Sequence, residues 1–69
     1  MSELVFNVTQ ESDGGYVAVA VGESIVTQGD TWDELRFMVL DAVMASFFDR
    51  QPPERIRLFL HVEQVLALA

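Results

Sequence analysis

The most informative part of this 69-residue chain is the stretch Thr27-Gln28-Gly29-Asp30-Thr31-Trp32-Asp33-Glu34-Leu35. Gly29, Asp30 and Thr31 interrupt a run of β-forming residues, and Thr31 stands three positions before Glu34, which is the spacing of a helix-capping box. Asp30 offers an alternative cap. Asp33 and Glu34 place negative charge in the first turn, where the helix dipole favours it. We therefore expect a strand to end here and a helix to begin at about Thr31.

The predicted helix covers residues 31–49 and stops before Pro52 and Pro53. Proline cannot continue a helix, and it pushes the preceding residue into extended geometry. Four segments alternate in the manner of strands, at residues 4–9, 16–21, 24–28 and 55–62. Asp13-Gly14 is a strong hairpin signal between the first two.

These elements predict one α+β domain over residues 1–69, with the order β-β-β-α-β. The first three strands should form an antiparallel meander, because their connections are short. We expect an antiparallel sheet with one long helix packed on one face. The apolar tail at residues 63–69 is open to two interpretations, a helical turn or a fifth, edge-pairing strand.

The predicted helix carries apolar residues on two sides. The side suited to packing on the sheet holds Trp32, Leu35, Met38, Val39, Ala42 and Val43. The opposite side holds Phe37, Leu40, Met44 and Phe48, hereafter the helix stripe, and Phe47 lies between the two. Glu34 and Asp41 belong to the narrow polar sector beside the stripe. One sheet cannot cover both sides, so the stripe is a candidate protein interface.

Three interpretations of the helix stripe remain open from the sequence: additional core, a self-association surface, or the site of a different protein. The uncovered face of the sheet is a second apolar surface for pairing. Its expected members are Val5, Val17, Val19, Val26 and Phe59.

The formal charge is −7, with four arginines and no lysine. Such a surface repels nucleic acid, whose non-specific binding depends on basic residues, and attracts a basic protein. Acidity that only keeps a small apolar domain soluble is the alternative. The chain has no cysteine and no apolar run of the ~18–20 residues that cross a bilayer, so we expect a cytoplasmic protein that does not bind membranes.

The sequence contains no pattern typical of an enzyme or a cofactor site. His61 is the only histidine, and no serine stands in a nucleophile-elbow context. Without cysteine, one histidine is a poor basis for a metal site. Arg55 and Arg57 could hold an anion, but pairing with nearby carboxylates is the simpler interpretation. We expect no catalytic residues, no cofactor and no metal.

The stretch Thr27–Leu35, after a Gly-Gly-Tyr hairpin and a Val-Ala-Val-Ala-Val strand, resembles the HicB-type antitoxins, especially their short single-domain relatives. The resemblance covers almost the whole chain. It implies a β-β-β-α-β layout likened to a partial ribonuclease H fold. It also implies a partner, since HicB-type proteins bind and block HicA, a small basic RNA-cleaving toxin. The chain lacks the Pro-Gly-Cys-like segment of longer members and has Gly22-Glu23-Ser24-Ile25 in its place.

These observations favour an antitoxin-like protein of a type II toxin–antitoxin system that occludes a HicA-like toxin. The predicted interface comprises Phe37, Leu40, Met44, Phe48, Glu34 and Asp41. The alternative function is an orphan homo-oligomeric module with no toxin partner. In both cases we expect a homo-oligomer, because so short a chain has a thin core.

Overall fold

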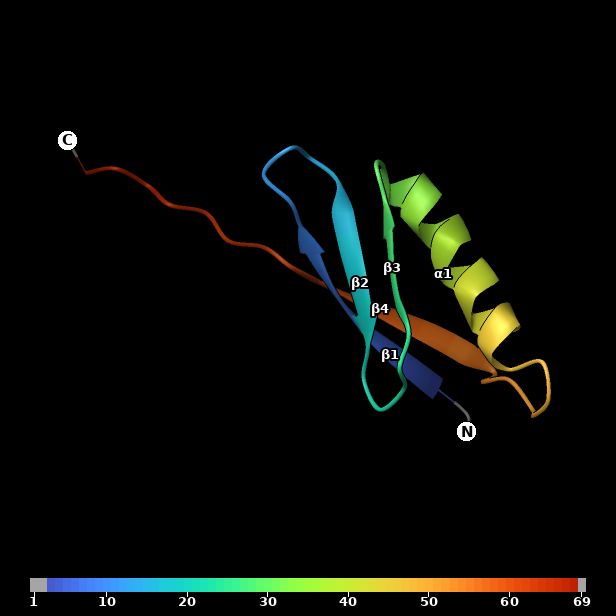
Figure 1. The fold of residues 1–69 in the computed structure, drawn as a ribbon. Coiled ribbons are helices and arrows are strands. Elements are labelled where there is room, and N and C mark those ends of the chain that lie inside the picture. Colours follow the sequence, from blue (N-terminus) through green and yellow to red (C-terminus); the bar gives the residue numbers. More distant parts are fainter. Residues whose placement is uncertain (1–2, 69) are drawn as a thin grey trace.

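A computed structural model describes residues 3–68, and its elements follow the predicted order (Figure 1). They are β1 (Glu3–Gln10), β2 (Tyr16–Ala20), β3 (Val26–Gly29), α1 (Trp32–Ser46) and β4 (Arg55–His61). The α+β class and the order β-β-β-α-β are confirmed, with one helix on one face of a four-stranded sheet. The observed bounds differ from the predicted ones only near the ends of the elements.

The first three strands form the predicted antiparallel meander, in which β2 lies between β1 and β3. The β1–β2 turn is closed by a hydrogen bond from the Gly14 N–H to the Glu11 carbonyl, at 3.0 Å. Asp13 Oδ1 accepts from the Gly15 N–H at 3.0 Å. Gly14 has a φ of +95°, a backbone conformation that glycine adopts without strain. The Asp-Gly signal therefore marks the turn correctly.

The fourth strand departs from the expected antiparallel sheet, because β4 pairs parallel with β1. The strand order is β3-β2-β1-β4, so the sheet is mixed. The helix explains the direction of β4. It returns the chain to the end of the sheet at which β3 began, so β4 must run parallel to β3 and therefore to β1. Parallel strands need such a crossover connection.

The helix begins where the capping box predicts. Thr31 is the N-cap in extended geometry, and its Oγ1 accepts a hydrogen bond from the Glu34 N–H at 3.1 Å. Asp30, the alternative cap, does not have this role. The helix ends at Ser46, earlier than the predicted residue 49, and the Phe47 N–H still bonds to the Val43 carbonyl.

The core lies between α1 and the face of the sheet that it covers. Its buried members are Leu4, Phe6, Val8, Ala18, Ala20, Ile25, Leu35, Val39, Val43 and Phe47. Trp32 and Ala42 are partly buried against it, as predicted. Met38 is exposed, contrary to the prediction, because it lies on the flank of the helix rather than over the sheet. Phe47 is buried.

Residues 62–68 are neither helix nor strand, so neither predicted form of the tail is present in the part that the structure describes. This tail continues from β4 away from the rest of the molecule (Figure 1). The Cα trace is therefore elongated, with extents of 55 × 20 × 17 Å. No helix within residues 3–68 combines the length and apolarity that crossing a membrane requires.

Candidate protein-binding surface

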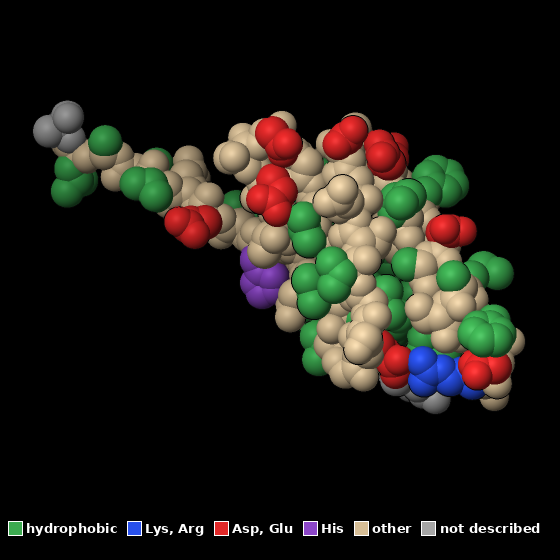
Figure 2. Space-filling view, in the orientation of Figure 1, with side chains coloured by type: hydrophobic (Ala, Val, Ile, Leu, Met, Phe, Trp, Pro, Cys, Tyr) green, Lys and Arg blue, Asp and Glu red, His purple; other side chains and the backbone are tan. Residues whose placement is uncertain are grey.

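Three members of the helix stripe, Phe37, Leu40 and Met44, lie on α1 outside its buried side, and Phe48 follows just beyond the end of the helix. Phe37, Met44 and Phe48 are 74%, 75% and 84% exposed, and Leu40 is 54% exposed. These four side chains do not belong to the core cluster. The interpretation of the stripe as additional core is therefore wrong. Figure 2 shows hydrophobic side chains and carboxylates close together along the helix side of the molecule.

The stripe is not flat, because two small hollows border it. One, of about 190 Å³, is lined by Asp33, Arg36, Phe37 and Leu40. The other lies between the helix and β4 and has a volume of about 150 Å³. We refer to it as the α1–β4 groove, and it is lined by Arg36, Val39, Leu40, Ile56 and Leu58. Leu40 joins the two hollows, so the stripe continues towards the edge of the sheet.

The carboxylates predicted beside the stripe are exposed and available for charged contacts. Glu34 and Asp41 take part in none of the ion pairs found within residues 3–68. Each arginine, in contrast, lies within 3.6 Å of another carboxylate. The stripe therefore has an acidic border whose charge is not neutralised by the chain's own arginines.

The shortest ion pairs found within residues 3–68 lie away from the stripe. Arg57 Nε donates to Glu3 Oε1 at 2.7 Å, and Arg55 Nε is 3.4 Å from Glu3 Oε2. The hydrogen bond from Arg57 lowers the pKa of Glu3, and the charges of Arg57 and Arg55 act in the same direction. Arg50 bonds to Glu23 at 2.7 Å, which raises the pKa of Arg50. Arg55 and Arg57 therefore form ion pairs with Glu3 of the same chain and do not make a free anion site.

The open face of the sheet is apolar in its middle, as the alternation predicted. Its members Val5, Val17, Val19, Val26 and Phe59 alternate with the buried strand residues and point away from the helix. Val26 is 66% exposed and Phe59 is 50% exposed. The apolar part of this face does not extend across the whole sheet, because polar side chains occupy its β1–β4 side. Among them, His61 Nε2 lies 3.0 Å from Asn7 Oδ1.

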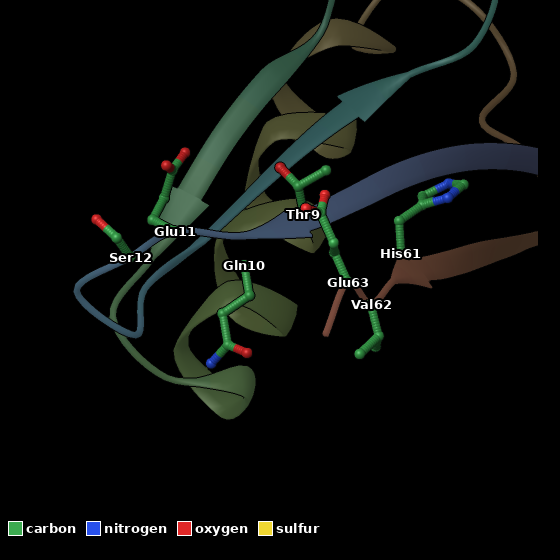
Figure 3. Close-up of a pocket in the computed structure, with 7 residues that line it drawn as sticks. All are labelled: Thr9, Gln10, Glu11, Ser12, His61, Val62 and Glu63. Atoms are coloured by element: carbon green, nitrogen blue, oxygen red, sulfur yellow. The ribbon is translucent and has the colours of Figure 1, made fainter. Parts of the chain in front are cut away.

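A cavity of about 630 Å³ opens where β1 and β4 diverge at the start of the tail (Figure 3). Its lining residues are Thr9, Gln10, Glu11, Ser12, His61, Val62 and Glu63. The labelled side chains point in several directions rather than towards one centre. No group of three histidine, aspartate or glutamate side chains that could hold a metal occurs within residues 3–68.

Five of the six predicted interface residues belong to α1, and Phe48 lies just beyond the helix, in the turn that follows Ser46. Two features were not predicted. The α1–β4 groove depends on where β4 lies in the sheet, which alternation alone does not specify. The apolar character of the tail was visible in the sequence, in Val65, Leu66 and Leu68. Its extended path and the exposure of these side chains were not predicted.

Two proteins are similar to this chain over most of its length. A UPF0150 protein of Thermotoga maritima is 46% identical over 50 residues, which cover 72% of this chain and 71% of that protein. A UPF0150 protein of Archaeoglobus fulgidus is 42% identical over 50 residues, covering 72% and 76%. No family model and no solved structure matches the chain. Identity at this level over more than two thirds of both sequences shows that the chain belongs to the UPF0150 family.

Proposed function

We propose that this chain is an antitoxin-like protein that binds a small basic RNA-cleaving protein through the helix stripe. The observation that carries the proposal is the exposure of four large apolar side chains, three on α1 and Phe48 just beyond its end. Exposed apolar patches of this kind mark interaction sites, and aromatic residues and methionine are enriched there. Phe37, Met44 and Phe48 supply both kinds of side chain.

Charge supports a basic partner in particular. The net charge of −7 attracts a basic protein from a distance, which raises the association rate. At short range, Glu34 and Asp41 stand beside the stripe without an arginine partner of their own. They would meet lysines or arginines that the partner otherwise uses to hold RNA phosphates. Binding would thus occlude the RNA-binding surface of the partner.

The resemblance of the stretch Thr27–Leu35 to HicB-type antitoxins supports the same function, and the observed element order agrees with that layout. A HicA-like toxin is the corresponding partner, and we place the complex in the cytoplasm. The role of this chain is inhibition by occlusion. We assign no catalytic residue to it.

The test is to co-express the tagged chain with small basic proteins encoded beside it and to measure complex formation by calorimetry. We expect a stoichiometric complex that weakens as salt rises and whose formation suppresses RNA cleavage by the partner. The double variant Phe37→Glu/Met44→Glu should lose binding by at least tenfold. Its matched control is Val21→Glu/Val26→Glu, which adds the same charge at exposed positions away from the helix. Equal affinity of the two double variants would refute the stripe as the binding site.

A second candidate function is a homo-oligomeric module with no toxin partner. The exposed apolar tail favours it, because Val65, Leu66 and Leu68 are 85%, 76% and 102% exposed. A chain that forms only complexes with itself when purified from its own host would support this function. In that case the acidic border of the stripe would have no basic partner to bind.

A further inference from the structure

The outer edge of β4 is open. The sheet order places β4 beside β1 on one side only, and no strand within residues 3–68 pairs with its other side. An edge strand offers unpaired N–H and C=O groups to another strand. This edge is also apolar, since Phe59 and Leu60 are exposed and Ile56 and Leu58 are only partly buried.

The tail continues the alternation of β4. Continued into the tail in extended geometry, the β4 alternation places residues 60, 62, 64, 66 and 68 on the helix side of the strand and residues 59, 61, 63, 65 and 67 on the open side. Three of the four tail positions on the helix side are apolar, namely Val62, Leu66 and Leu68. The tail therefore has the sequence of a strand but, within residues 3–68, no neighbour with which to pair.

We propose that the missing neighbour is β4 of a second copy, with the two β4–tail segments running antiparallel about a two-fold axis at Val62. Each tail then lies along the free edge of the partner copy's β4, and the two sheets join into one. The pairing needs no change in the domain itself, because the tail already continues from β4.

The side chains select this register. A two-fold axis perpendicular to the sheet keeps both helices on the same face, so residues on the same side of the two strands must pair. With Val62 opposite itself, Leu58 faces Leu66 and Ile56 faces Leu68 on the helix side. On the open side, Phe59 faces Val65 and His61 faces Glu63. Apolar pairs across strands are stabilising.

The neighbouring registers are worse. Sliding the strands by two residues in one direction places Phe59 opposite Glu63. Sliding them by two in the other direction places Glu63 opposite the same residue of the second copy, and like charges directly opposite each other destabilise a strand pair. The chosen register also brings Leu66 and Leu68 next to the β4 wall of the α1–β4 groove, which is formed by Ile56 and Leu58.

This self-interface goes beyond the proposed function of the helix stripe and does not depend on it. The two surfaces lie on different elements, α1 and β4. A dimer built through the tails leaves Phe37, Met44 and Phe48 exposed for another protein.

The oligomeric mass of the complete chain tests the proposal first. The monomer mass is 7.7 kDa, so the expected dimer has twice that value, 15.4 kDa, in sedimentation equilibrium. The variant Leu66→Asp/Leu68→Asp should be monomeric at concentrations where the wild type is dimeric. Phe37→Glu/Met44→Glu, altered on the stripe, should remain a dimer. A monomeric wild type, or a dimer lost only in the stripe variant, would overturn the proposal.

Cross-linking then tests the register, and the chain is convenient because it lacks cysteine. Val62→Cys should form a disulfide-linked dimer on mild oxidation, because facing Cα atoms in an antiparallel pair lie about 4.5–5.5 Å apart, within the range of about 4.4–6.8 Å that a disulfide spans. Leu60→Cys and Gln64→Cys, each made alone, are the matched controls, since neither faces itself. Cross-linking of the three variants at equal rates would contradict the register even if a dimer forms.

Discussion

Gly29 and Leu35 approach so closely that a Cβ atom on Gly29 would lie 2.5 Å from the Leu35 nitrogen and 2.8 Å from the Leu35 Cα. The contact is between the end of β3 and the first turns of α1, and both residues are buried. Neither atom is the end of a flexible side chain, so the backbone itself would have to move. The absence of a side chain at Gly29 thus lets the helix pack directly on the end of β3.

Gly29→Ala should therefore destabilise the domain by about 1–3 kcal/mol or more, the usual cost of overpacking. Gly15→Ala is the matched control, because its Cβ would meet Asp13 Oδ1 at 3.3 Å and the Gly29 carbonyl oxygen at 3.4 Å, which are milder contacts. Thermal unfolding measures both variants. Similar melting temperatures for the two would contradict the packing argument.

Phe47 and Phe48 are adjacent in the sequence but differ in exposure, at 5% and 84%. Phe47→Ala should cost about 3–5 kcal/mol, the range for emptying a buried aromatic site. It also removes the ring that the Arg50 guanidinium covers at 4.1 Å. Phe48→Ala should change stability by no more than about 0.5 kcal/mol. Urea denaturation of the two variants checks the prediction, and an equal loss would mean that Phe48 is covered in solution.

The Thr31 cap gives a third prediction. Thr31→Ala removes the acceptor of the Glu34 N–H and should lower the free energy of unfolding by about 1 kcal/mol. Thr31→Ser keeps a side-chain oxygen at the same place and should retain most of that stability. If Asp30 took over the cap, circular dichroism melts of the alanine and serine variants would coincide.

The ion pair between Glu3 and Arg57 should make the stability of the protein depend on pH. Because the folded-state pKa of Glu3 is lowered, its stabilising contribution is present above the ordinary glutamate pKa and is lost as pH falls through the folded value. Arg57→Gln should therefore destabilise the protein near neutral pH and have less effect in acid. Chemical denaturation over a pH series measures this difference.

Arg36→Gln is the control for that series. It breaks the pair of Arg36 with Asp33, which spans 3.6 Å between two exposed side chains. Exposed pairs of this kind contribute little. The quantity to follow is the difference in free energy of unfolding between the wild type and Arg57→Gln. If this difference stays constant from neutral pH to acid, the linkage is refuted.

Local patterns in the sequence predicted most of the fold. Thr31 and Glu34 located the start of the helix, Asp13-Gly14 located a hairpin, and Pro52 separated the helix from the last strand. Each of these signals acts through atoms only a few residues apart. The helix stripe was predictable for the same reason, since a helical period fixes which side chains share a side.

Long-range relationships were not predictable in this way. Alternation shows which side chains of β4 share a face but not that β1 is its neighbour, so the parallel pairing and the α1–β4 groove were missed. Met38 was assigned to the core because the helical period does not show how far the sheet extends beneath the helix. Gly29 was recognised as a strand breaker, while its close approach to Leu35 depends on tertiary packing.

The parallel pairing of β1 with β4 also bears on how the protein folds. It joins Glu3 to Arg55 and Thr9 to His61, so the two strands are separated by most of the chain. Contacts between such distant residues slow folding, because a long loop must close before they form. The β1–β2 hairpin can assemble while synthesis continues, at about 5–20 residues per second. One edge of β1, with the core residue Phe6 at its centre, must then wait for β4 to leave the ribosome. A chain truncated after α1 would therefore keep this edge of β1 unpaired and open to chaperones or to another strand.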